Sequence, residues 1–139
     1  FIGMHAGVER GHMTRAILEG VSYALKDSLD LMNPLGVNPV RAVAVGGGAG
    51  SPVWLQILSN VLNLELRTVS PSEGASLGAA MLAAIGYGAF CSPADAVESW
   101  LFDLETIEPD PSVLEQYAVG YDRYVSLYPL LKPVFTSNV

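Results

Sequence analysis

The sequence predicts an α/β fold built around a parallel sheet. Its 139 residues alternate between strand-like and helix-like stretches, which is typical of parallel α/β domains. Half of the residues are hydrophobic and only 15% are charged, enough apolar side chains for one substantial core. A glycine-rich stretch joins the first predicted strand to a helix. Because only two strands are clear, we expect an incomplete sheet in a fragment of a longer protein.

The first half of the chain predicts two helices around one strand. Apolar or small side chains recur at helical spacing over 9–32, and Asn33-Pro34 should end that helix. The short apolar stretch RAVAVG (41–46) reads as a buried strand. A helix should then run over 52–62, with Ser51 as its N-cap and Pro52 at its first position.

A second strand and a helix of small residues follow. ELRTV (65–69) predicts the strand, and Ser70 with Glu73 has the spacing of a capping box. The helix over 73–85 is rich in glycine and alanine, Ala79 among them, so we expect close packing against the sheet or another helix. Its end is predicted at Gly86 and Gly88.

The last third is less regular. A short helix is predicted over 93–98, and FDLETIEPDP (102–111) reads as a polar, irregular crossing. A terminal helix is predicted over 112–132, where four tyrosines recur at helical spacing. We expect this tyrosine stripe to pack in the core.

Composition excludes several classes of partner. The net charge is −7 with only 7 lysines and arginines, which disfavours binding to nucleic acid or to an anionic membrane surface. No apolar stretch is long enough to span a bilayer. Cys91 is the only cysteine, so no intramolecular disulfide forms, and a reducing, cytoplasmic setting is predicted. We expect Cys91 itself to be half-buried.

The stretch VGGGAGSP (45–52) is the candidate functional segment. Four glycines in five positions exceed what a tight turn needs and cost backbone entropy. Backbone N–H groups in such a bend and at the next helix start favour anionic oxygens, so contact with a nucleotide or phosphate is preferred over a turn without a ligand. No lysine follows as a P-loop requires, and the third glycine is off the spacing of a dinucleotide fingerprint.

Other conspicuous residues have structural explanations. His5 and His12 lack further ligands nearby in the sequence, so no metal site is predicted. Ser51 has no neighbouring histidine to activate it and reads as a cap, not as a nucleophile. Trp54 is expected to fill the core rather than to border an adenine. Glu19 is expected to be a buried, paired carboxylate.

Three stretches together resemble the C-terminal domain of the FGGY carbohydrate kinases, of the actin-like ATPase (ribonuclease H-like) superfamily. GMHAGVERGHMTRAILEG (3–20) is similar to the family's second signature, and VAVGGGAGSPVWLQILSNVL (43–62) to its adenosine motif. SEGASLGAAMLAAIGYG (72–88) resembles its E-x-x-A-x-G-A-A helix. Within the family, GGGA-x-SP-x-W and RA-x-LEGV are typical of xylulokinases, whereas the tail beyond residue 90 matches loosely.

The resemblance implies where a nucleotide would lie. Gly47, Gly48 and Ala49 would pass under the ribose and α-phosphate of ATP, while Ser51 and Pro52 would line the adenine side. ATP with Mg²⁺ is the implied cofactor, and no residue of this chain is assigned to the metal. The family's catalytic aspartate and phosphate loop belong to an earlier segment, so no catalytic residue is expected in 1–139.

The function implied is the nucleotide-binding half of a sugar kinase. Such an enzyme transfers a phosphoryl group from MgATP to a sugar hydroxyl, here of D-xylulose. The resemblance implies two domains that close over a cleft, of which the N-terminal domain is absent from this sequence. Kinases of glycerol, gluconate or ribulose and a non-enzymatic, actin-like nucleotide-binding protein remain alternatives. A dinucleotide-binding domain is disfavoured, because no acidic residue ends the strand at 65–69. A homodimer is left open.

Overall fold

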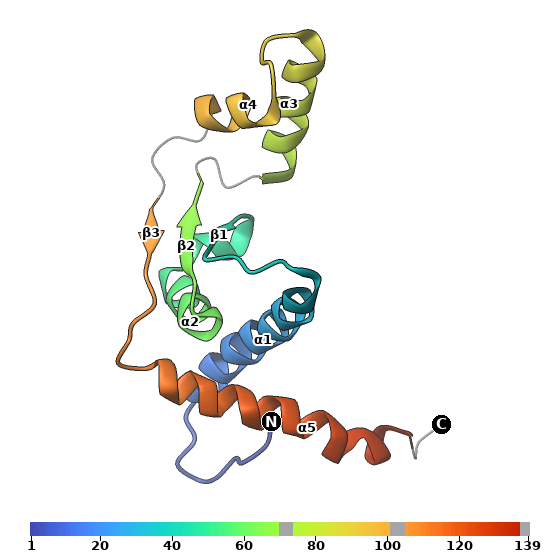
Figure 1. Ribbon diagram of the computed structural model, residues 1–139. Helices are drawn as coiled ribbons and strands as arrows, with labels where there is room; N and C mark the ends of the chain where they lie inside the picture. Colours follow the sequence, from blue (N-terminus) through green and yellow to red (C-terminus); the bar gives the residue numbers. More distant parts are fainter. Residues whose placement is uncertain (70–73, 101–104, 137–139) are drawn as a thin grey trace.

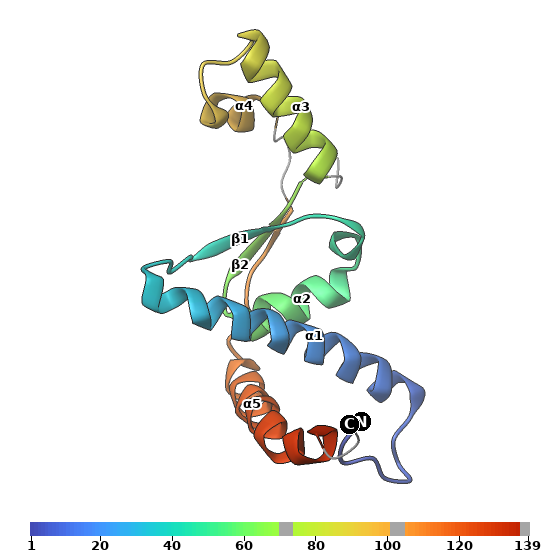
Figure 2. The same ribbon diagram turned by 90° about the vertical axis from the view of Figure 1, so that its right-hand side faces the viewer.

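The computed structural model describes residues 1–69, 74–100 and 105–136. A small sheet lies at the centre, with α1 (Arg10–Met32) and α2 (Pro52–Leu62) packed beside it and α5 (Leu114–Thr136) crossing them at one end (Figures 1 and 2). At the other end, α3 (Gly74–Tyr87) and α4 (Pro93–Trp100) form a pair (Figure 1). No helix among these described residues is long and apolar enough to cross a membrane.

The sheet has the order β1-β2-β3 in the described part of the chain. β1 (Arg41–Ala44) pairs with β2 (Glu65–Thr68) in parallel, as expected. The prediction of an irregular crossing at 102–111 was wrong in part, because β3 (Thr106–Ile107) pairs antiparallel with β2. The sheet is therefore mixed.

Polar side chains of α2 bind the backbone of the described part of this crossing, at Ile107 and Asp110. The buried Ser59 hydroxyl donates to the carbonyl oxygens of Leu64 and Ile107 at 2.8 and 3.3 Å. Asn60 accepts from the N–H of Asp110 at 2.8 Å. These hydrogen bonds replace the water that would otherwise solvate a polar segment.

Two apolar clusters form the core on either side of α2. One joins α2 to the sheet through Leu55, Leu64 and Leu66, with Ala42 and Ala44 of β1 packed against it. The other joins α2 to α1 and α5 and contains the buried side chains of Tyr23, Ile57, Val61 and Tyr117. Three of the four stripe tyrosines pack there, as expected, whereas Tyr128 is exposed.

The structure also differs from the sequence prediction in the second half of the chain. α3 packs against α4 and Ala79 is exposed, so the expected close packing at this alanine was wrong. α5 continues past Lys132 through Pro133 to Thr136, whose hydroxyl donates to the carbonyl oxygens of Lys132 and Pro133 at 3.1 and 3.2 Å. Cys91 is exposed, not half-buried. The capping box predicted at Ser70 and Glu73 lies outside the described residues.

Candidate functional site

The glycine-rich segment forms a compact bend between β1 and α2. Gly46 has φ +86°, in the region that favours glycine, and turns the chain away from the strand. A single 3₁₀ turn, Gly47–Gly50, follows. Its hydrogen bonds run from the N–H of Ala49 to the Gly46 carbonyl at 3.0 Å and from the N–H of Ser51 to the Gly48 carbonyl at 3.1 Å.

Helix α2 begins as predicted, immediately after this bend. Ser51 is its N-cap, and the Ser51 hydroxyl accepts a hydrogen bond from the N–H of Trp54 at 3.4 Å. Pro52 occupies the first helical position, where a missing N–H costs no hydrogen bond. The serine is thus occupied as a cap, consistent with its interpretation as structural rather than nucleophilic.

Two backbone donors remain available at the bend. The N–H groups of Gly47 and Gly48 precede the first hydrogen bond of the 3₁₀ turn, and within the described chain they donate to no protein acceptor. A Cβ placed on Gly47 would meet nothing within 4 Å, so the space beside this residue is open. Together with the partial positive charge at the start of α2, this arrangement suits an anionic oxygen.

A second helix starts near the same place. A Cβ on Gly74, the first residue of α3, would lie 3.0 to 3.1 Å from side-chain atoms of Val45, which directly precedes the bend. The first turn of α3 therefore lies against the carboxyl end of β1. Ligands in open α/β folds bind at this end of the strands, because helix starts gather there.

The predicted site residues Gly47, Gly48, Ala49, Ser51 and Pro52 thus lie together in the bend. Gly47 and Pro52 are exposed, and the other three are half-buried. The prediction missed Gly46, whose positive φ makes the bend possible. Its place directly after the apolar strand is the signal that could have identified it.

Trp54 takes a position that the sequence did not predict. Its indole is half-buried and packs directly against Gly48, where a Cβ would come within 1.8 Å of Cζ3 of the ring. Its Nε1 is buried and has no hydrogen-bond partner among the described residues. The tryptophan thus lies beneath the bend, and its ring occupies the space that a side chain at residue 48 would need.

The other candidates have structural roles. Nδ1 of His12 accepts from the N–H of Glu9, and Nδ1 of His5 accepts from the N–H of Gly7, both at 3.1 Å. The described residues contain no group of three or more His, Cys, Asp or Glu side chains that could hold a metal ion. Glu19 is paired with Arg15 at 2.8 Å and remains partly exposed.

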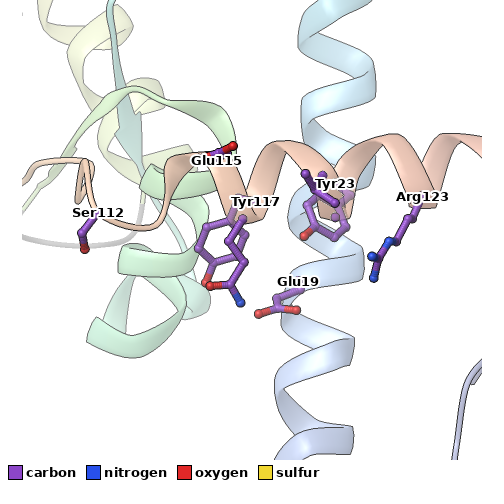
Figure 3. A pocket seen from close by; sticks show the side chains of 9 residues that line it. Glu19, Tyr23, Ser112, Glu115, Tyr117 and Arg123 are labelled. Carbon is purple, nitrogen blue, oxygen red and sulfur yellow. The ribbon is translucent and has the colours of Figure 1, made fainter.

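A hollow of about 530 Å³ lies elsewhere, between α1 and α5. Figure 3 shows Glu19 and Tyr23 of α1 beside Tyr117 and Arg123 of α5. Arg15 donates to the Tyr117 hydroxyl at 2.6 Å, so the Glu19–Arg15 pair joins the two helices. Burial, and then the negative charge of Glu19, raise the pKa of Tyr23 to about 12. These contacts join α1 to α5 beside the hollow, and we call this region the joint between the two helices.

Comparison with known proteins agrees with this architecture. The chain is 32% identical over 98% of its length to the xylulose kinase of Bacillus subtilis (strain 168), covering 27% of that protein. It is 30% identical over 95% of its length to the L-xylulose/3-keto-L-gulonate kinase of Escherichia coli (strain K12), covering 26% of it. The chain spans about a quarter of the length of these relatives.

The fold comparison gives the same result. The crystal structure of xylulose kinase from Rhodospirillum rubrum matches 98% of this chain with a TM-score of 0.84 and 35% identity, over 28% of that chain. This likeness confirms an α/β part of the actin-like ATPase fold. A model of the FGGY family of carbohydrate kinases, C-terminal domain, matches residues 1–87. The chain therefore belongs to the FGGY family of carbohydrate kinases.

Proposed function

We propose that this chain is the nucleotide-binding portion of an ATP-dependent kinase that converts D-xylulose to D-xylulose 5-phosphate. The observation that carries the proposal is the bend between β1 and α2, where two backbone donors meet no acceptor among the described residues, in a chain of a carbohydrate kinase family. All of residues 1–139, including β3 and α5 beyond the family-matched residues, belong to this portion. The enzyme works in the cytoplasm, in keeping with the single, free Cys91.

The bend fits the ATP phosphates and ribose. The N–H groups of Gly47 and Gly48 would donate to phosphate oxygens, and the open space beside Gly47 admits the nucleotide to the backbone. Ala49 would lie under the ribose, next to Gly48, and Ser51 and Pro52 would border the adenine. Mg²⁺ would be bound by the phosphates and by residues outside this chain, since the metal usually keeps waters and few protein ligands.

Chemistry is assigned to the rest of the protein. Phosphoryl transfer depends on positioning and charge neutralisation, with a base that orients the sugar hydroxyl. This chain corresponds to about a quarter of the length of its relatives. The residues that supply the base and the phosphate loop would lie in the remaining three-quarters of such a protein. This chain binds the nucleotide and holds it for transfer, and no residue of 1–139 is given a catalytic role.

The choice of sugar rests on the names of relatives. The proteins from B. subtilis and R. rubrum are named xylulose kinases, and the E. coli relative is named for L-xylulose and 3-keto-L-gulonate. A ketopentose is the substrate class that most of these names share. Glycerol, gluconate and ribulose belong in the test as competitors, because other members of the family act on different polyols and sugars.

The test compares the full-length protein with residues 1–139 alone. ADP production by the full-length protein should depend on the sugar, with D-xylulose giving the highest kcat/KM in a panel of D-xylulose, L-xylulose, D-ribulose, gluconate and glycerol. The isolated chain should produce no ADP with any of them. A higher kcat/KM for another sugar would identify that sugar as the substrate in place of D-xylulose. ATP binding by the full-length protein without sugar-dependent turnover would favour the non-enzymatic alternative.

A further inference from the structure

The contact between Trp54 and Gly48 is the closest approach that the structure records at any glycine. A Cβ built on Gly48 would lie 1.8 Å from Cζ3, 2.5 Å from Cε3 and 2.9 Å from Cη2 of the indole. Ordinary contacts between carbon atoms are about 3.5–4.0 Å. All three atoms belong to the six-membered ring, so part of this ring fills the space that a side chain at residue 48 would occupy.

The glycines of the bend therefore serve different purposes. Among the described residues 45–52, Gly46 alone has a positive φ, so glycine is required there by backbone conformation. Gly47 and Gly50 face open space. Gly48 needs neither a positive φ nor open space, and its missing side chain makes room for the indole.

The ring is well placed to control the bend. Trp54 is on the first turn of α2, and its backbone N–H is bound to the cap residue Ser51 at 3.4 Å. The carbonyl of Gly48 accepts from the N–H of Ser51 at 3.1 Å. Trp54 thus contacts the bend through its ring and through the cap residue. The N–H groups of Gly47 and Gly48, which meet no acceptor in the described part of the chain, lie in the segment that the ring contacts.

We propose that Trp54 is a positioning residue for the nucleotide: its indole supports Gly48 and so sets where the N–H groups of Gly47 and Gly48 point. The inference rests on the proposed function, since it names what holds the proposed ATP site in place. The buried Nε1 of Trp54 has no partner among the described residues, which is unfavourable. Among the described residues, packing of the ring is therefore the interaction that explains the tryptophan at this position.

The test is a double-mutant cycle in the full-length protein, using Gly48→Ala, Trp54→Leu and the two combined. Gly48→Ala should raise the KM for ATP by about tenfold or more, because displacement by an ångström weakens binding strongly, while kcat changes little. Trp54→Leu should raise the same KM, because the support is lost. The double variant should bind ATP better than Gly48→Ala alone, since the shorter side chain leaves room for the methyl group.

Gly50→Ala is the matched control, because it adds the same methyl group in the same bend where nothing lies within 4 Å. Its KM for ATP should stay within about twofold of the wild type. Melting temperatures of all variants are measured without ATP. The coupling between residues 48 and 54 should appear both in melting temperature and in KM.

Two results would overturn the inference. If Gly48→Ala raises the KM for ATP equally in the wild-type and Trp54→Leu backgrounds, the ligand, and not the indole, requires that residue 48 have no side chain. If coupling appears in melting temperature while every variant keeps the wild-type KM for ATP, Trp54 is structural only. Failure of the proposed function itself is recognised separately, because the wild-type protein would then bind no ATP or show no sugar-dependent turnover.

Discussion

Replacing Gly120 by alanine should loosen the joint between α1 and α5. Gly120 lies on α5 opposite Tyr23 of α1, and a Cβ there would come within 2.1 Å of the Tyr23 hydroxyl and 3.1 Å of Cζ. Since ordinary contacts are about 3.5–4.0 Å, the ring would have to retreat by roughly 1.5 Å. The methyl group can be accommodated only if Tyr23 moves.

Tyr23 borders the hollow between α1 and α5, but neighbouring side chains hold its ring. Tyr23 is only 9% exposed, and its side chain packs in a cluster with Ile57, Val61 and Tyr117. The ring centroids of Tyr124 and Tyr121 lie 5.6 and 6.0 Å from its own. Overpacking of this kind typically costs about 1–3 kcal/mol. Alanine is favoured over glycine in a helix by about 0.5–1 kcal/mol, so the net loss of stability should be about 1 kcal/mol and no more than about 2.5 kcal/mol.

The assay is the thermal unfolding of the full-length protein, followed together with hydrogen exchange of the α5 amides. Gly120→Ala should lower the unfolding temperature and speed exchange in α5. Adding Tyr23→Phe to it should recover much of the loss, because the atom closest to the new methyl group is removed. Gly20→Ala on α1, where a Cβ would meet nothing within 4 Å, is the control and should leave stability unchanged or slightly raised.

The reasoning is refuted if Gly120→Ala is as stable as the wild type and exchanges at the same rate in α5. It also fails if Tyr23→Phe brings no recovery, since the clash would then not lie between these two side chains. A loss of stability in Gly20→Ala of the same size would mean that any alanine in these helices is harmful, whatever its neighbours.

Two further predictions concern the joint at high pH and the adenine side of the site. Burial raises the pKa of Tyr23 to about 12 in the folded protein, against about 10 in the unfolded protein. The contribution of neutral Tyr23 to stability is therefore complete below pH 10 and is lost as the pH rises toward 12. Over this window the unfolding midpoint should fall more steeply with pH in the wild type than in Tyr23→Phe, and parallel curves would contradict the prediction. Pro52→Arg, at an exposed position, should change the stability of the free protein by no more than about 0.5 kcal/mol. It should nevertheless reduce the rise in melting temperature on adding ATP, because a long side chain would stand on the adenine side; Val53→Arg, also exposed, is the control, and an equal ATP effect in both variants would remove Pro52 from the site.

Local sequence was sufficient for the succession of strand, bend and helix at the site. Ser51 and Pro52 predict the start of α2 because capping and a fixed φ act within one turn, and the helix begins at Pro52. The glycines predict a bend for the same reason. Their separate purposes could not be predicted, because Gly48 makes room for a ring that belongs to the following helix.

Longer-range packing decided what the sequence left open. The strand β3 has two residues, too few for a periodic pattern, and it is held by β2 and by Ser59, which is 48 residues away in the chain. Ala79 belongs to a stretch of small residues that predicts close packing, yet whether a neighbour covers it depends on the placement of the whole helix.

The α/β class, the main helices, the bend and the family resemblance could all be predicted from sequence, because each depends on residues that are neighbours in the chain. The contacts of Trp54 with Gly48, and of Tyr23 with Gly120 97 residues further along, became visible once the elements were packed together. The physical reason is that propensities and caps act over a few residues, whereas the space around a side chain is set by every element packed against it.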